Sequence, residues 1–327
     1  MKEIIRALTE CFGPSGHESA VREIIRGALP RGVETRVDPL GTLIAHRPGQ
    51  GRRVMLAAHM DEIGIVVTHI DQRGFLRFGA VGGVFIPPLA GGRVQFANGT
   101  TGVIGMERQD DGGRAPAMEK FYVDVGATSP ADCPVKVGDT ACFKRTCEFQ
   151  GTRIIAKAMD DRIGCAILLQ VMQELSSTPH DLSFVFTVQE EVGLRGATAA
   201  GFGVDPELAL AVDITLTGDT PECPPLAMAL GAGPAIKIKD RAMLSHPGVK
   251  DWLIRTAEGA GIPYQREVLI MGTTDAAAIQ LSRAGVPAGC ISIPTRYAHM
   301  PSEMADSADV ENSVRLLVKA LSGPIDI

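Results

Sequence analysis

Apolar and polar residues follow two different patterns along this chain. Glu3–Cys11 and Ser19–Leu29 place apolar residues at helical spacing, and the turn residues Gly13–Gly16 separate them. Apolar runs without that spacing follow at Leu43–His46 and Val54–Ala58. The period of the apolar positions distinguishes helices from strands. The first part of the chain therefore predicts two helices followed by two buried strands.

The pattern changes between residues 64 and 151, where helical periodicity is nearly absent. Short β-branched runs alternate there with Gly, Pro and Asp turn residues, as in small β-barrels and sandwiches. These runs are Ile65–His69, Arg93–Phe96, Val103–Met106 and Phe121–Val125. We expect them to form a separate unit.

After residue 151, helical and extended patterns alternate to the end of the chain, which is typical of an α/β layer. Helices are expected after Asp160-Asp161, at His246–Gly259, at Asp275–Ala284 and from Ser307, an expected N-cap, through Leu321. Extended segments are expected at Leu182–Val188, Leu208–Val212, Ala235–Lys239, Gln265–Ile270 and Gly289–Ile293. The fold prediction is a discontinuous α/β domain, residues 1–63 and 152–327, with helices flanking a mixed β-sheet. A small β-barrel domain, residues 64–151, is inserted in it.

Composition narrows the classes of protein. Of 327 residues, 45% are hydrophobic and 21% charged, which indicates a globular chain. A net charge of −6 without a basic stripe argues against nucleic-acid binding. No run reaches the ~18 apolar residues of a membrane span, and Lys2, Glu3 and Arg6 interrupt any signal-peptide core. Cysteines without CxxC pairs indicate free thiols, so we expect a cytoplasmic protein.

Two adjacent carboxylates, Glu190 and Glu191, follow the apolar run Leu182–Val188. Burying both is costly unless a cation lies beside them. Groups that would complete a cation site stand at other expected strand ends and helix starts: His59, Asp61, Asp160, Asp213 and His299. Such positions meet at one edge of an α/β sheet. The set therefore predicts a metal centre.

Each of these residues also has an ordinary structural interpretation. His59 and His299 suit a buried core, Asp160 suits a helix N-cap, and the glutamates suit a solvated strand end. Five such coincidences at matching places favour the functional interpretation. Asp61 lies two residues after His59, on the same side of an extended chain, and is expected to fix its ring tautomer.

Seven motifs carry a resemblance to a known family. They are Gly13-Pro14-Ser15-Gly16-His17-Glu18, His59-Met60-Asp61, Met159-Asp160-Asp161-Arg162, Glu190-Glu191-Val192-Gly193, Val212-Asp213, Gly272-Thr273-Thr274-Asp275 and Tyr297-Ala298-His299. In this order they resemble the TET-type (tetrahedral) dinuclear-metal aminopeptidases, zinc-exopeptidase-like enzymes related to glutamyl aminopeptidases, some once labelled cellulases. The resemblance covers essentially the whole chain. It implies an inserted domain that dimerises and dimers that assemble into dodecamers.

The resemblance also implies roles for individual residues. Two divalent metal ions would be held by His59, Asp160, Glu191, Asp213 and His299, with His59 and Asp213 on different metals and Asp160 bridging them. A cis peptide is implied between Asp160 and Asp161. Oxygen and nitrogen ligands suit zinc first, with cobalt and manganese as alternatives. Three carboxylates against two divalent ions leave net positive charge to activate water, and Glu190 would be the general base.

The substrate is expected to be a peptide with a free N-terminus. The residues that line its binding pocket are harder to predict from the sequence. Thr274, Asp275, Arg296 and Tyr297 are candidates through their closeness to His299. Arg296 would suit acidic N-termini, and a solvent-facing or intersubunit role stays open. A carboxypeptidase or amide deacylase on the same metal core is the alternative function. A polysaccharide hydrolase would need two metal-free carboxylates. A non-enzymatic protein descended from a peptidase would have lost metal ligands.

Overall fold

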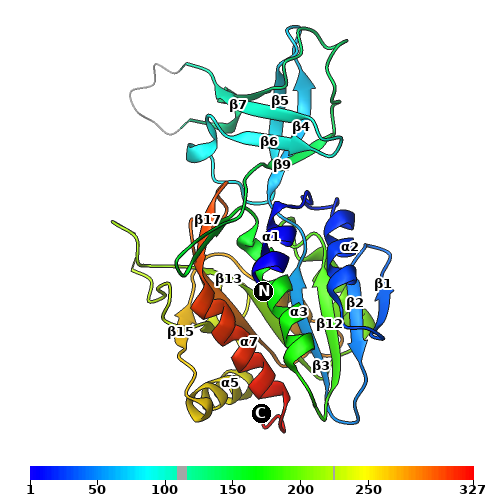
Figure 1. The fold of residues 1–327 in the computed structure, drawn as a ribbon, viewed down its shortest axis with the longest axis vertical. Coiled ribbons are helices and arrows are strands. Elements are labelled where there is room, and N and C mark those ends of the chain that lie inside the picture. The colour runs from blue at the N-terminus through cyan, green and yellow to red at the C-terminus, as the bar shows by residue number, and fades with distance from the viewer. Residues whose placement is uncertain (109–115, 224) are drawn as a thin grey trace.

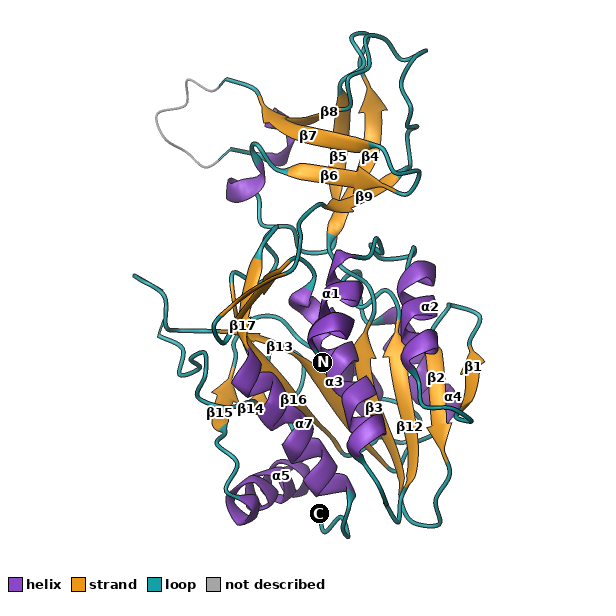
Figure 2. Ribbon diagram, in the orientation of Figure 1, coloured by secondary structure: helices purple, strands orange, loops and turns teal. Residues whose placement is uncertain are grey.

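The computed structural model describes residues 1–108, 116–223 and 225–327. It contains a mixed β-sheet covered by helices on both faces and a closed antiparallel barrel at one end of that sheet (Figures 1 and 2). The expected α/β class and the expected small barrel are both confirmed. The division into domains at residues 64 and 151 stays a prediction.

Parallel strands form the centre of the sheet. Its order is β1-β2-β12-β3-β13-β16-β17-β11-β10, with β14 pairing β16 and β15 pairing β14. The bounds are β1 Glu34–Val37, β2 Leu43–Arg47, β3 Arg53–His59, β10 Glu148–Gln150, β11 Arg153–Ala156, β12 Asp181–Thr187, β13 Leu208–Leu216, β14 Ala235–Lys239, β15 Gln265–Val268, β16 Ala288–Arg296 and β17 Glu303–Asp306. Strands β12, β3, β13 and β16 are parallel neighbours. Both faces of such strands are buried, which explains their near-continuous apolar runs.

Helices cover the two faces of the sheet unequally. The larger core lies under α1 Lys2–Glu10, α2 Ser19–Ala28, α3 Met159–Glu174, α5 Pro247–Ala260 and α7 Ser307–Leu321. The smaller core on the opposite face lies under α4 Arg195–Val204 and α6 Asp275–Gln280 and is rich in alanine. Small side chains let these two short helices approach the strands closely. Within the described residues, no helix combines the length and apolar character needed to cross a membrane.

The barrel has a hydrophobic core of its own, which includes Phe78, Phe96 and Phe143. Its strands are β4 Gly64–Ile70, β5 Leu76–Val81, β6 Arg93–Phe96, β7 Thr101–Met106, β8 Phe121–Asp124 and β9 Thr140–Phe143, closed in the order β4-β5-β8-β7-β6-β9. Short 3-10 helices occupy Pro87–Leu89 and Met118–Lys120. Closure gives each of these six strands two neighbours. The cysteines are free thiols, as expected.

The start of the last helix corrects one expectation. Asp306, not Ser307, is the N-cap of α7, and its carboxylate accepts a hydrogen bond from the backbone N–H of Ala308 at 2.8 Å. The same carboxylate accepts the Thr152 hydroxyl at 2.7 Å. Serine and aspartate both cap helices well, so the sequence did not distinguish Asp306 from Ser307, and we expected the serine.

Replacing Asp306 by alanine should therefore lower the free energy of unfolding by about 1–2 kcal/mol, through loss of the cap. Ser307→Ala is the matched control and should change it by less than about 0.5 kcal/mol. Urea unfolding of both variants measures the difference. Equal effects would show that the cap assignment is wrong.

Candidate metal centre

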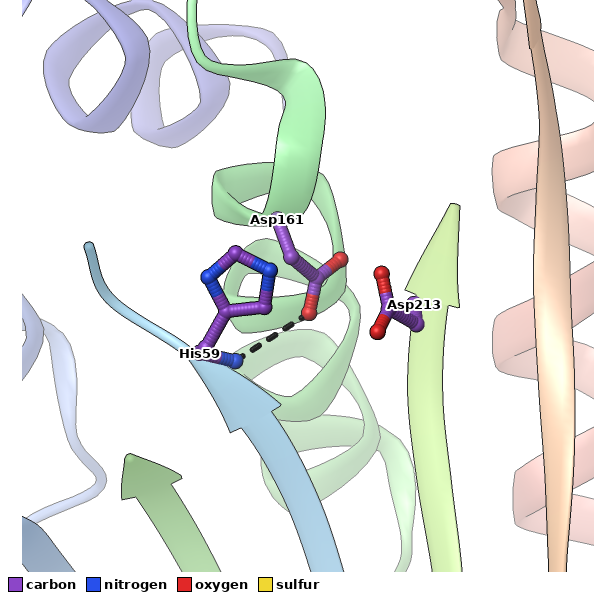
Figure 3. Close-up of side chains that lie close together, drawn as sticks. All are labelled: His59, Asp161 and Asp213. Atoms are coloured by element: carbon purple, nitrogen blue, oxygen red, sulfur yellow. Dashed lines mark hydrogen bonds between the residues drawn. The ribbon is translucent and has the colours of Figure 1, made fainter. Parts of the chain in front are cut away.

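Three elements bring buried polar groups together at the carboxyl-end edge of the parallel strands. His59 is the last residue of β3, Asp161 lies at the start of α3, and Asp213 lies within β13 (Figure 3). Sequence placed Asp213 just after its strand, whereas β13 continues to Leu216. One ligand atom from each of these residues lies within 4.8 Å of the others, a spacing suited to one ion.

Asp160 lies between the two histidines. Its Oδ1 is 3.0 Å from Nε2 of His59, and its Oδ2 is 3.2 Å from Nε2 of His299. Nε2 of His299 is also 3.7 Å from Oε2 of Glu191. The peptide between Asp160 and Asp161 is cis, as the resemblance implied. All five expected ligands therefore converge, with Asp160 at the centre.

Ligand atoms of His59 belong to two close groups, one with Asp161 and Asp213 and one with Asp160 and Glu191. The expectation that His59 and Asp213 hold different metals stays a prediction. His299 lies near Glu191, on the other side of Asp160. The contacts place Asp160 between His59 on one side and His299 with Glu191 on the other.

Asp61 organises the loops around the centre. The Nδ1 of His59 is 3.1 Å from the backbone carbonyl of Asp61 and 3.4 Å from its Oδ1. The Asp61 carboxylate also accepts the backbone N–H groups of Glu190 at 3.0 Å and Glu191 at 3.2 Å, and the Ser15 hydroxyl at 2.6 Å. Ser15 belongs to the Gly-Pro-Ser-Gly turn. Asp61 thus orients the imidazole and also anchors the acidic pair.

Two further carboxylates hold the backbone of expected ligands. Glu303, on β17, accepts the N–H of Asp160 at 3.2 Å and that of His299 at 3.0 Å. Burial raises the pKa of Glu303 to about 8. Asp161 accepts the N–H of His59 at 3.2 Å. No motif pointed to Glu303, and its place four residues after His299 was the only available signal.

The electrostatics test whether cations fit here. Burial raises the pKa of Glu190 and Asp213 well above their usual values and that of Glu191 to about 7. Burial alone would lower the pKa of His299, but its hydrogen bond with Asp160 raises it to about 11. Each raised pKa means that the group binds a proton more readily than usual. The site therefore favours added positive charge.

Two further features agree with this fit. Asp160 is the exception among the carboxyl groups: burial would raise its pKa, but its contacts with His299 and His59 lower it. Oε1 of Glu191 is buried and has no hydrogen-bond partner among the described residues. Oxygen and nitrogen donors without thiolate suit zinc, cobalt or manganese. The residues present therefore fit divalent metal ions.

The four candidate pocket residues differ in how available they are to a substrate. Thr274 and Asp275 are buried, and Asp275 accepts the hydroxyl of Thr187. The guanidinium of Arg296 is held by both carboxylate oxygens of Asp219, at 2.9 and 2.7 Å. Tyr297 is the exposed member of the group. Their assignment to the pocket stays a prediction, and Arg296 already has an anionic partner.

Comparison with known proteins gives a consistent result. The model of the M42 glutamyl aminopeptidase family matches residues 41–316. A candidate aminopeptidase of Acetivibrio thermocellus is 46% identical over 324 residues, 98% of each chain. The solved aminopeptidase APDkam598 of Desulfurococcus kamchatkensis is 38% identical with a TM-score of 0.93, over 98% of this chain and 94% of that one.

A second solved relative is known for its assembly. The TET1 peptidase of Pyrococcus horikoshii, which assembles into a tetrahedron or a large octahedral shell, is 31% identical with a TM-score of 0.86, over 98% of each chain. The fold, the convergence of the site residues and these similarities agree. This chain belongs to the M42 glutamyl aminopeptidase family of metal-dependent peptide hydrolases.

Proposed function

We propose that this aminopeptidase removes single residues from the free N-termini of peptides with two divalent metal ions held by five side chains. They are His59, Asp160, Glu191, Asp213 and His299. The observation that carries the proposal is the position of Asp160, whose two carboxylate oxygens face Nε2 of His59 and Nε2 of His299. A carboxylate that faces two ligand sets can bridge two ions.

Two divalent ions held by these residues would supply Lewis-acid activation of water and of the scissile carbonyl. Formal charge supports this: three ligand carboxylates and two neutral imidazoles leave one positive charge of four uncompensated. Zinc is the first expectation, with cobalt and manganese as alternatives.

Glu190 is the proposed general base. Its Oε2 lies 3.9 Å from Nε2 of His59, and its side chain is 11% exposed. Glu190 therefore borders the proposed metal site, while the adjacent Glu191 is the proposed ligand. Burial raises its pKa well above the usual value, which makes its carboxylate more basic. In this role Glu190 accepts a proton from the attacking water and returns it to the leaving amine. Its backbone bond to Asp61 fixes its position.

Self-association through the barrel is the second part of the proposal. Strand β7 exposes Val103 and Met106, 48% and 43% exposed, on the outside of a module whose core is already complete. Shell assembly in the P. horikoshii relative supports a dodecamer built from dimers here. A sizing column on the purified protein tests this, and a monomer would contradict it.

A panel of aminoacyl chromogenic amides tests the reaction. We expect hydrolysis of amides with a free α-amine and rates at least about 100-fold lower for N-acetylated counterparts, because the metal centre, when occupied, would orient the substrate through its free amine. The panel includes acidic, basic and aliphatic residues, which reveals the preferred N-terminus. Cleavage of only the N-acetylated members would favour the amide deacylase alternative, and release of C-terminal residues from peptides would favour the carboxypeptidase.

A further inference from the structure

The connection between β5 and β6, which belongs to the barrel, reaches the metal centre. The backbone carbonyl of Gly83 is 2.8 Å from Nδ1 of His299. Two residues later, the backbone N–H of Phe85 donates to the carbonyl of His299 at 3.2 Å. Since Gly82 follows directly on β5, this contact links the barrel to a side chain that follows β16. His299 is therefore held at its ring and at its backbone by the same short segment.

Both glycines are required by close approach. A Cβ added at Gly83 would lie 2.6 Å from Nδ1 and 2.9 Å from Cε1 of His299. A Cβ added at Gly82 would lie 3.0 Å from Oε2 of Glu191, and the φ of Gly82 is +76°. Contacts under 3.0 Å force atoms to move. A side chain at position 83 would thus displace the imidazole itself.

His299 needs such support more than His59 does. The side chain of His59 is 2% exposed and is locked by packing, whereas that of His299 is 39% exposed. The φ of His299 is +61°, in the left-handed region. A half-exposed histidine without a partner for Nδ1 would sample other rotamers and both tautomers.

We propose that Gly82–Phe85 is a positioning segment for His299, so that the barrel completes the metal centre in addition to any role in assembly. The Gly83 carbonyl accepts the Nδ1–H of His299, so that in the neutral imidazole that binds a metal Nε2 is the free nitrogen, aimed toward Asp160 and Glu191. This inference rests on the proposed function, because it takes His299 as a metal ligand. Partners of this kind fix ligand tautomers, and their loss typically costs 10–100-fold in metal affinity.

Gly83→Ala tests the proposal in the full-length protein. Zinc titration by calorimetry should show the ion nearest His299 bound about 10–100-fold more weakly, while the other ion keeps its affinity. The matched control is Gly79→Ala in β5, where the added Cβ would meet only Thr68 at 3.7 Å and Val66 at 3.9 Å. It should bind zinc as the wild type does. Wild-type affinity at both sites of Gly83→Ala would overturn the proposal.

A double-mutant cycle with His299→Ala shows whether the effect runs through His299. In the His299→Ala background, adding Gly83→Ala should cause no further loss of zinc affinity. A further loss of the same size would contradict a positioning role. If Gly83→Ala alone does not fold, removing the ring that its Cβ meets should restore folding in the double variant. A double variant that still fails to fold would contradict the proposed contact.

The proposed function can fail separately from this inference. If wild-type protein binds no zinc, or if His299→Ala binds it with unchanged affinity, the metal assignment is wrong. If His299→Ala weakens zinc binding and Gly83→Ala does not, only the positioning role of the barrel segment is wrong.

Discussion

Replacing Glu190 by glutamine is expected to lower kcat by roughly 10²–10⁴-fold while both metal ions stay bound. Glutamine keeps the size of the side chain but cannot accept a proton. The backbone contact between Glu190 and Asp61 does not depend on the carboxylate and should persist. Steady-state kinetics on an aminoacyl amide, with metal content measured on the same sample, check the prediction.

Glu191→Gln is the informative comparison. Its carboxylate lies 3.7 Å from Nε2 of His299 and is a proposed ligand, so this variant should lose metal as well as activity. The exposed Glu174→Gln should change neither. Turnover near the wild-type rate in a fully metallated Glu190→Gln protein would exclude the general-base role.

Metal withdrawal is expected to abolish hydrolysis. Chelation should bring the rate below detection, and readdition of zinc, cobalt or manganese should restore it, because no other group in the centre supplies Lewis acidity. Withdrawal should also lower the thermal midpoint, since bound ions stabilise the folded state. Burial raises the pKa of Glu190, Glu191 and Asp213, and repulsion from neighbouring carboxylates raises it further, so negative charge is unfavourable there without a cation.

The expected result of chelation has two separate readouts. Activity reports on the reaction, and the melting temperature reports on occupancy of the site. Full activity after exhaustive chelation, with no metal detected, would refute the metal mechanism. A polysaccharide hydrolase that uses two metal-free carboxylates would give that result.

The local patterns of the chain predicted much of the fold. Helical spacing located α1, α2 and α5 to within about two residues, and buried β-rich runs located β3, β12 and β16. Strands β1, β5, β9, β10, β11 and β17 and the helix α4 were not predicted. They are short, and several are exposed or alternate between polar and apolar residues, so their own sequence carries little signal.

The candidate site was predictable to a similar degree. The acidic pair after a buried strand, the His-x-Asp motif and the order of the motifs along the chain pointed to the five expected ligands, and the structure brings them together. The way in which these proposed ligands would divide between two ions was not predictable. It depends on which side of Asp160 each ligand lies, and strand ends do not specify that.

The sequence by itself determined which residues could be buried, which chemistry their side chains offer and which family they belong to. Tertiary structure alone decided that Glu303 holds the backbone of two proposed ligands and that Gly83, from the barrel, contacts His299. The reason is physical. Burial and chemistry are properties of residue types and their local spacing, whereas contacts between distant residues, such as Gly83 and His299, depend on how the barrel packs against the sheet.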